Sequence, residues 1–327
     1  MNRKIYLIFV LIILSSSLFV SCKEDELDES IFDVNVPDLD EKAFTYKFDK
    51  FLYDNFLIPY NMQFLYKMQH ISTDNKYNLV PAKLENSKKL AALVKYLWLD
   101  AYEEIADSNF LKLNSPRIIH VIGSSAINPL SGTEIVGLAE GSIKISLFKV
   151  NQLNITDLSV LNENYFKTMH HEFAHILHQK KTYPREFNYF SIDDYMPAGW
   201  EKRHSSVAAS LGFVSSYAGS ETREDFVEVI ANYIVKTEAQ WDQLLNTAKR
   251  EWKQIDEDNP GKGVTATEEY DGVDGDKLIL EKLDKCRVWL KDAWGIDIDA
   301  LRAEVQERQS KINTEFVNSL LIEYGIE

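Results

Sequence analysis

The residues best suited to chemistry are His171, Glu172 and His175, within the stretch "TMHHEFAHILHQ" at positions 168–179. Two histidines four residues apart on a helix point the same way and can hold one zinc ion between their rings. A glutamate directly after the first histidine lies beside such an ion, where it can take a proton from a water. The spacing H-E-x-x-H therefore predicts a zinc site with a general base; the alternative is a solvated, histidine-rich helix face.

The two other histidines of this stretch do not have the spacing of the zinc-binding pair His171 and His175, which we call the clamp. His170 has neither a glutamate one residue on nor a histidine four residues on. His178 lies on nearly the same face as His175, and we expect it to be a hydrogen-bonding neighbour rather than a ligand. The longer motif H-E-x-x-H-x-x-G-x-x-H needs glycine at 178 and histidine at 181, but this chain has His178 and Lys181. The third ligand must therefore come from elsewhere.

A helix over 163–180 positions the pair, with Asn162 as its expected N-cap. Its apolar residues fall on one stripe, and the two clamp histidines lie roughly 200° around the helix from that stripe. The stripe consists of Phe166, Met169, Phe173 and Ile176.

The stretch "SYAGSETREDFVEVIANYIV" at 216–235 offers a third ligand. It predicts a helix over about 222–237 that starts with a capping box formed by Thr222 and Asp225. Glu224 and Glu228 share another face of this helix, four residues apart. One carboxylate could bind zinc while the other orients a ligand imidazole, or both could be plainly exposed to solvent. The residues alone do not say which glutamate is the ligand.

The remaining patterns predict an α+β fold. Helices over 44–61 and 85–107 precede a strand at 117–123 and a hairpin at 133–148 that turns at Glu140–Gly141. After the histidine helix comes an irregular stretch over 181–220. Helices at about 222–237 and 238–255, a polar loop over 256–276, and helices at about 276–294 and 298–322 follow. We thus expect a small mixed sheet with an active-site helix, followed by a mainly helical C-terminal part.

The N-terminus resembles that of an exported bacterial lipoprotein. Arg3 and Lys4 precede a short apolar run, and Cys22 follows "SLFVS", although Phe19 is larger than such motifs favour. We expect a signal peptide at 1–21, a palmitate-type lipid anchor on Cys22 and an acidic flexible tether over 22–42. An ordinary cleaved signal peptide and an uncleaved anchor are the alternatives.

The predicted folded part covers 43–327, with an N-terminal lobe over about 43–180 and a C-terminal lobe over about 181–327. The net charge of −15 excludes electrostatic binding to nucleic acid or to an anionic membrane surface. Cys286 is the second of two cysteines and lies in a helical pattern, so we expect it to be a buried small hydrophobe.

"HEFAH", "SYA" and "EDFVE" together resemble the gluzincin metallopeptidases. More closely, they resemble the zinc-binding metallopeptidase lipoproteins associated with outer-membrane nutrient importers, and "DGDKLILEKLDKCRVWLKDAWGIDIDALR" is similar to the same family. The resemblance implies a zincin-like fold and one zinc ion. It implies that Glu224 is the third ligand, that Glu228 orients a ligand histidine, and that Tyr217 helps to hold the developing oxyanion.

From the motif and the resemblance together we expect a zinc metallopeptidase that cleaves peptides or proteins. The alternatives are a zinc hydrolase of another amide or ester, and a non-catalytic surface binding lipoprotein of a nutrient-import complex. We expect the chain at the outer membrane, facing the cell surface and held there by its lipid, with a nutrient importer as a partner.

Overall fold

The computed structural model describes residues 39–327 apart from 69–76, 128–133, 136 and 141–142. The predicted signal peptide, Cys22 and most of the predicted tether lie outside the described residues. Contacts divide the chain into Met1–Ala43 and Phe44–Glu327, and every element below belongs to the second unit. Within the described part of the chain, no helix is both long enough and apolar enough to cross a membrane.

A mixed four-stranded sheet has the order β1–β2–β6–β5. The strands β1 (Gln63–Leu65), β2 (Ile118–Val121) and β6 (Lys144–Leu147) are parallel, and β5 (Gly137–Glu140) runs antiparallel to β6 at one end of the sheet. The predicted hairpin is therefore present as β5 and β6, and its turn falls partly on residues outside those described. The short β4 (Glu134–Ile135) pairs instead with β3 (Ala126–Ile127).

The N-terminal helices each contain a π-helical turn. The first runs through α2 (Tyr46–Leu52), η2 (Tyr53–Leu57) and α3 (Ile58–Tyr60), and the second through α4 (Leu84–Val94), η4 (Lys95–Leu99) and α5 (Asp100–Ile105). The short α6 (Phe110–Asn114) leads into β2. Trp98 of η4 is fully buried, and its ring contacts that of Phe173 edge to face at 5.1 Å. This contact anchors the apolar stripe of the histidine helix in the core.

The histidine helix begins one turn earlier than the sequence predicts. It runs through α7 (Leu158–Leu161), η6 (Asn162–Phe166) and α8 (Lys167–Lys180). Asp157 is the N-cap, since its carboxylate accepts from the backbone N–H of Val160 at 3.1 Å. The predicted cap at Asn162 is wrong: its buried side chain donates to the carbonyl of Val235 at 3.2 Å and exchanges hydrogen bonds with Gln309.

The C-terminal part is mainly helical, as predicted. It contains α9 (Ser205–Ser210), α10 (Thr222–Val235), α11 (Glu238–Ala248), β7 (Glu251–Gln254), β8 (Val264–Thr267), α12 (Gly275–Trp294), α13 (Ile298–Ser310) and α14 (Thr314–Glu323). Short 3-10 helices lie at Arg185–Tyr189, Trp200–Lys202 and Pro260–Lys262, and another lies before α7 at Val150–Gln152.

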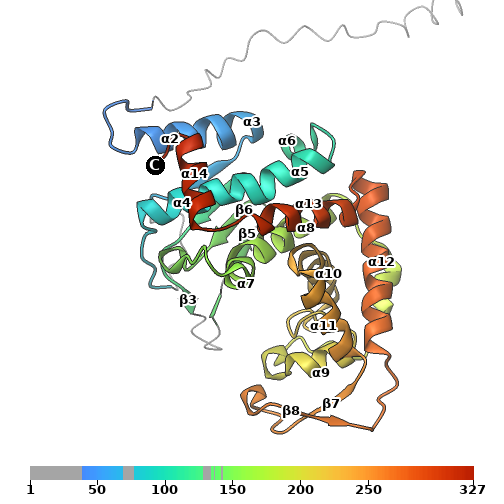
Figure 1. Cartoon of the computed structure of the whole chain (residues 1–327). Helices are drawn as coiled ribbons and strands as arrows, with labels where there is room; N and C mark the ends of the chain where they lie inside the picture. The colour runs from blue at the N-terminus through green and yellow to red at the C-terminus, as the bar shows by residue number, and fades with distance from the viewer. Residues whose placement is uncertain (1–38, 69–76, 128–133, 136, 141–142) are drawn as a thin grey trace, which may run out of the picture. The chain divides into compact units, whose positions relative to one another are not determined.

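Two predictions in this part need correction. The helix expected over 238–255 stops at Ala248, and the polar loop expected over 256–276 contains one strand of the antiparallel pair β7–β8. The last helices, α13 and α14, pack against α5 and α4 (Figure 1). Cys286 on α12 is fully buried, and its thiol lies 3.8 Å from the carbonyl oxygen of Phe226 on α10.

Candidate metal centre

The helices α8 and α10 pack closely against each other and bring four of the predicted site residues together (Figure 1). His171 and His175 lie on α8, and Glu224 and Glu228 lie on α10. Burial of the apolar residues Phe173 and Phe226 in the common core fixes the two helices against each other. Side chains separated by some fifty residues in sequence therefore meet in one site.

Three potential ligand atoms form a nearly equilateral triangle. Oε2 of Glu224 lies 3.1 Å from Nε2 of His171 and 3.2 Å from Nε2 of His175, and the two Nε2 atoms are 3.2 Å apart. Zinc bonds of about 2.0–2.1 Å at a tetrahedral angle require ligand atoms about 3.3 Å apart. The triangle therefore has the size that one zinc ion needs.

The position of the hydrogen on the ring of His171 also favours a cation bound at Nε2. Nδ1 of His171 lies 2.8 Å from Oε1 of Glu228, a carboxylate that can only accept, so Nδ1 carries the hydrogen. In a neutral ring, Nε2 then carries a lone pair, and this lone pair lies against the carboxylate of Glu224. Lone pairs brought this close repel each other unless a cation lies between them, and zinc supplies one.

Without a metal, a proton on His171 takes the place of that cation. Burial lowers the pKa of His171, but hydrogen bonds to Glu224 and Glu228 outweigh burial and raise it to about 10. Burial raises the pKa of Glu224, but its hydrogen bonds to His171 and His175 outweigh burial and hold this pKa well below its usual range. The site is therefore built around one positive charge.

Glu228 is fully engaged away from the ligand triangle. Besides His171, its carboxylate accepts from Oγ of Ser215 at 2.6 Å and from Nδ2 of Asn232 at 3.1 Å. Although burial opposes ionisation, the charge of Lys167 and these hydrogen bonds keep the pKa of Glu228 well below normal. Glu228 is therefore a fixed anion that orients the imidazole of His171.

His178 plays the corresponding part for the second histidine. Its Nε2 lies 2.9 Å from Nδ1 of His175. Burial, together with the charge of His175, lowers the pKa of His178 to about 4, so His178 is neutral and can accept the hydrogen of Nδ1. It is a hydrogen-bonding neighbour, and His170 lies apart, with its Nδ1 at 3.1 Å from the hydroxyl of Tyr102.

Glu172 lies at the same site but differs from both other glutamates. It is 8% exposed, and one of its oxygens lies within 4.8 Å of ligand atoms of His171 and His175. This closeness makes Glu172 a conceivable ligand, yet Glu224 completes the tighter triangle. Among the described residues nothing donates a hydrogen bond to Glu172, and burial raises its pKa. A buried carboxylate with a raised pKa is suited to accept a proton.

Tyr217 lies on the loop between α9 and α10, beside the ligands. Its ring centroid is 5.9 Å from that of His171, and the side chain is 36% exposed. Burial of the hydroxyl and the negative charge of Glu224 raise its pKa, so the phenol keeps its proton. Ser215 fixes this loop, because its Oγ accepts from the backbone N–H of Ala218 at 3.0 Å while it donates to Glu228.

Sequence reasoning missed several partners of these residues. The capping box predicted at Thr222 and Asp225 is not formed, and α10 has no side-chain cap. Asp225 is instead fully buried, 2.7 Å from Nζ of Lys282, and also accepts from the hydroxyl of Tyr195 at 2.8 Å. Asn232 could have been found, because it lies four residues after Glu228 on the same helical face.

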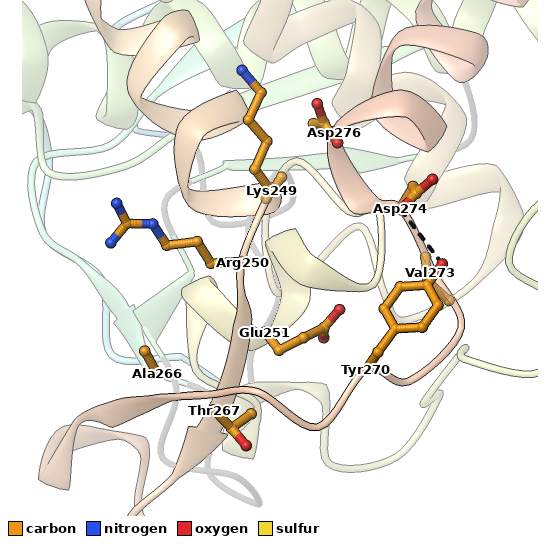
Figure 2. A pocket seen from close by; sticks show the side chains of 10 residues that line it. Lys249, Arg250, Glu251, Ala266, Thr267, Tyr270, Val273, Asp274 and Asp276 are labelled. Carbon is orange, nitrogen blue, oxygen red and sulfur yellow. Dashed lines mark hydrogen bonds between the residues drawn. The ribbon is translucent and has the colours of Figure 1, made fainter.

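A surface pocket of about 350 Å³ lies apart from this site, between the end of α11, the strands β7 and β8 and the start of α12 (Figure 2). No metal-site residue lines it. Its walls carry charges of both signs, and the hydroxyl of Tyr270 is 3.4 Å from Asp274. We therefore place the chemistry at the α8–α10 site and not in this pocket.

Comparisons with known proteins identify the family of this chain. A model of the family described as "Putative zinc-binding metallo-peptidase" matches residues 41–299. The crystal structure of a protein described in the same words, from Bacteroides caccae, is 36% identical with a TM-score of 0.65; the match covers 84% of this chain and 95% of that one. None of the curated proteins matches. The chain belongs to this zinc-binding metallo-peptidase family.

Proposed function

We propose that this protein is a zinc-dependent peptidase. One observation carries the proposal: a ligand triangle of the size required by zinc lies beside Glu172, a buried carboxylate without a hydrogen-bond donor among the described residues. A purely structural zinc site has four protein ligands and no use for a base. Three ligands with an adjacent base are typical of a catalytic site.

His171, His175 and Glu224 would hold the ion. When bound, zinc would lower the pKa of a water towards 7 and polarise the scissile carbonyl. Glu172 takes a proton from the attacking water and later gives it to the leaving amine. The phenol of Tyr217 donates a hydrogen bond to the carbonyl oxygen as negative charge develops on it.

The edge of the sheet offers a place for an extended substrate. β5 is the end strand of the four-stranded sheet, and it packs against α8, the helix of the clamp. An extended peptide could pair with β5 and so run past the ligands. This geometry favours a peptide over a compact amide or ester.

The test measures zinc content and cleavage of casein for the wild type and Glu172→Gln. We expect the variant to bind zinc normally and to lose about 10²–10⁴-fold in kcat, the usual contribution of a general base. Glu315→Gln is the matched control, because this glutamate is exposed on α14. An active zinc-free protein, or equal activity of Glu172→Gln, would refute the proposal; zinc binding without turnover of any substrate would favour a binding protein.

We also propose that the mature chain is anchored through lipid on Cys22 at the outer membrane, facing outward, where it works beside a nutrient importer. The first 22 residues support this proposal, because basic residues are followed by a short apolar run and then by Cys22. Cys22→Ser should abolish labelling by palmitate and move the protein to the soluble fraction. External protease should remove the wild type from intact cells; full protection would place it on the inner side.

A further inference from the structure

Trp200 stands one aromatic ring away from the metal ligands. Its ring centroid is 4.9 Å from that of Tyr217, at an interplanar angle of 66°, and Tyr217 in turn lies 5.9 Å from His171. Trp200 is only partly buried. It therefore enlarges the aromatic surface that Tyr217 forms beside the ligands, and part of the indole is accessible to solvent.

The loop that carries Trp200 is tied to the loop that carries Tyr217. The backbone N–H of Met196 donates to the carbonyl of Gly219 at 2.7 Å, and Oγ of Ser216 donates to the carbonyl of Arg203 at 2.8 Å. These bonds bracket Trp200 on both sides in sequence. Gly199 supplies the turn before Trp200, with a φ of 94° that a residue with Cβ rarely adopts.

Arg203 strengthens the same connection. Its Nη2 donates to the carbonyl of Asp194 at 2.9 Å, which closes the loop on itself. Its guanidinium lies over the ring of Phe213, 5.7 Å from the centroid, at the start of the loop that carries Tyr217. The backbone that carries the indole is thus held in place before any substrate arrives, and a preorganised wall binds at a lower entropic cost.

The partly exposed indole has the chemistry of a recognition surface. Within the described part of the chain, its N–H has no hydrogen-bond partner, whereas the comparable N–H of Trp252 donates to the carbonyl of Thr247 at 2.9 Å. A fixed indole face packs well against flat or large apolar groups, and its N–H can donate to a peptide carbonyl.

We propose that Trp200 and Tyr217 form the wall of a substrate subsite that takes an aromatic or large aliphatic side chain next to the scissile bond. Trp200 determines specificity, and Tyr217 also contacts the reacting carbonyl. This inference rests on the proposed peptidase function, and it adds a substrate class: peptides with a large apolar residue at that position, in preference to alanine or an acidic residue.

The test uses two peptide hydroxamates that differ only in phenylalanine or alanine beside the metal-binding group, with zinc-loaded wild type, Trp200→Ala and Trp200→Phe. We expect Trp200→Ala to bind the phenylalanine compound about tenfold more weakly and the alanine compound within twofold of wild type. Trp200→Phe should keep most of the preference. Trp252→Ala is the matched control, a partly exposed tryptophan on β7 that should leave both affinities unchanged.

Matched peptide substrates give the second measurement. The wild type should cleave the phenylalanine peptide with the higher kcat/KM, and Trp200→Ala should lose this preference mainly through KM. If Trp200→Ala weakened the binding of both hydroxamates equally, Trp200 would only support Tyr217, and the subsite proposal would be overturned. A wild type with no preference between the two compounds would overturn it as well. If the wild type cleaves nothing but binds both hydroxamates, the peptidase proposal fails, and the affinity ratio still decides the subsite.

Discussion

Glu224 and Glu228 can be told apart by two isosteric substitutions, because the structure gives them different partners. Oε2 of Glu224 contacts Nε2 of both histidines, and Oε1 of Glu228 contacts only Nδ1 of His171. We expect Glu228→Gln to weaken zinc binding by about 10–100-fold, which is the usual effect of losing an outer partner of a ligand. Glu224→Gln removes an anionic ligand and should weaken zinc binding by more than this range.

The contacts of Glu228 give the magnitude. Its bond to His171 changes from charge-assisted to neutral in Glu228→Gln, and the difference is about 1–1.5 kcal/mol, or roughly tenfold in zinc affinity. The amide nitrogen then faces Ser215 and Asn232. The Ser215 hydroxyl can rotate and accept a hydrogen bond from this nitrogen. The Asn232 amide nitrogen can only donate, so two buried N–H donors, one of the introduced glutamine and one of Asn232, face each other. That contact should cost about 1–3 kcal/mol of unfolding free energy, with or without metal.

Competition with a chromogenic chelator measures the zinc Kd of each variant, and urea denaturation of the metal-free proteins measures the stability term. Glu315→Gln serves again as the control and should match the wild type in both. If Glu228→Gln lost zinc completely while Glu224→Gln kept it, the ligand assignment would be reversed. A zinc Kd of Glu228→Gln within twofold of wild type would refute the orienting role of Glu228.

Three further outcomes follow from the same contacts. Tyr217→Phe should lower kcat by about 10²–10³-fold with unchanged zinc content, and an unchanged kcat would remove Tyr217 from the chemistry. Lys282→Met leaves Asp225 buried without its cation and should lower the free energy of unfolding by about 3–5 kcal/mol, measured by chemical denaturation. Adding Asp225→Asn should recover part of this stability. Chelation should lower the melting temperature of the wild type, since free zinc at 100 times its Kd contributes about 2.7 kcal/mol, and should leave Glu224→Gln unaffected.

The histidine clamp was predictable because its geometry is local. Residues four apart on one helix share a face whatever the rest of the chain does, so spacing alone could predict that His171, Glu172 and His175 lie together. The α+β class followed from patterns of similar range. The ligand among Glu224 and Glu228 could not be assigned in this way, because both lie on the same face and differ only in what packs against them.

The two failed capping predictions share a physical cause. Asn162 and Asp225 are good capping residues, and each lies where a helix start is plausible, yet each is buried against a partner far along the chain. Asn162 meets Gln309, and Asp225 meets Lys282. A polar side chain is satisfied equally well by a local backbone N–H or by a distant side chain, and only the fold decides between them.

The three glutamates of the site differ in role because they differ in hydrogen-bond donors. Glu228 accepts from three side chains and remains a fixed anion. Glu224 lies against the Nε2 atoms of both histidines, where a proton or a metal ion must balance its charge. Glu172 lacks a donor among the described residues, and burial, together with the charges of Glu224 and Glu228, raises its pKa, whereas the pKa values of the other two are lowered. In the proposed mechanism one side-chain type thus provides the orienting anion, the ligand and the base, and a donor placed beside Glu172 should remove its catalytic role while leaving zinc bound.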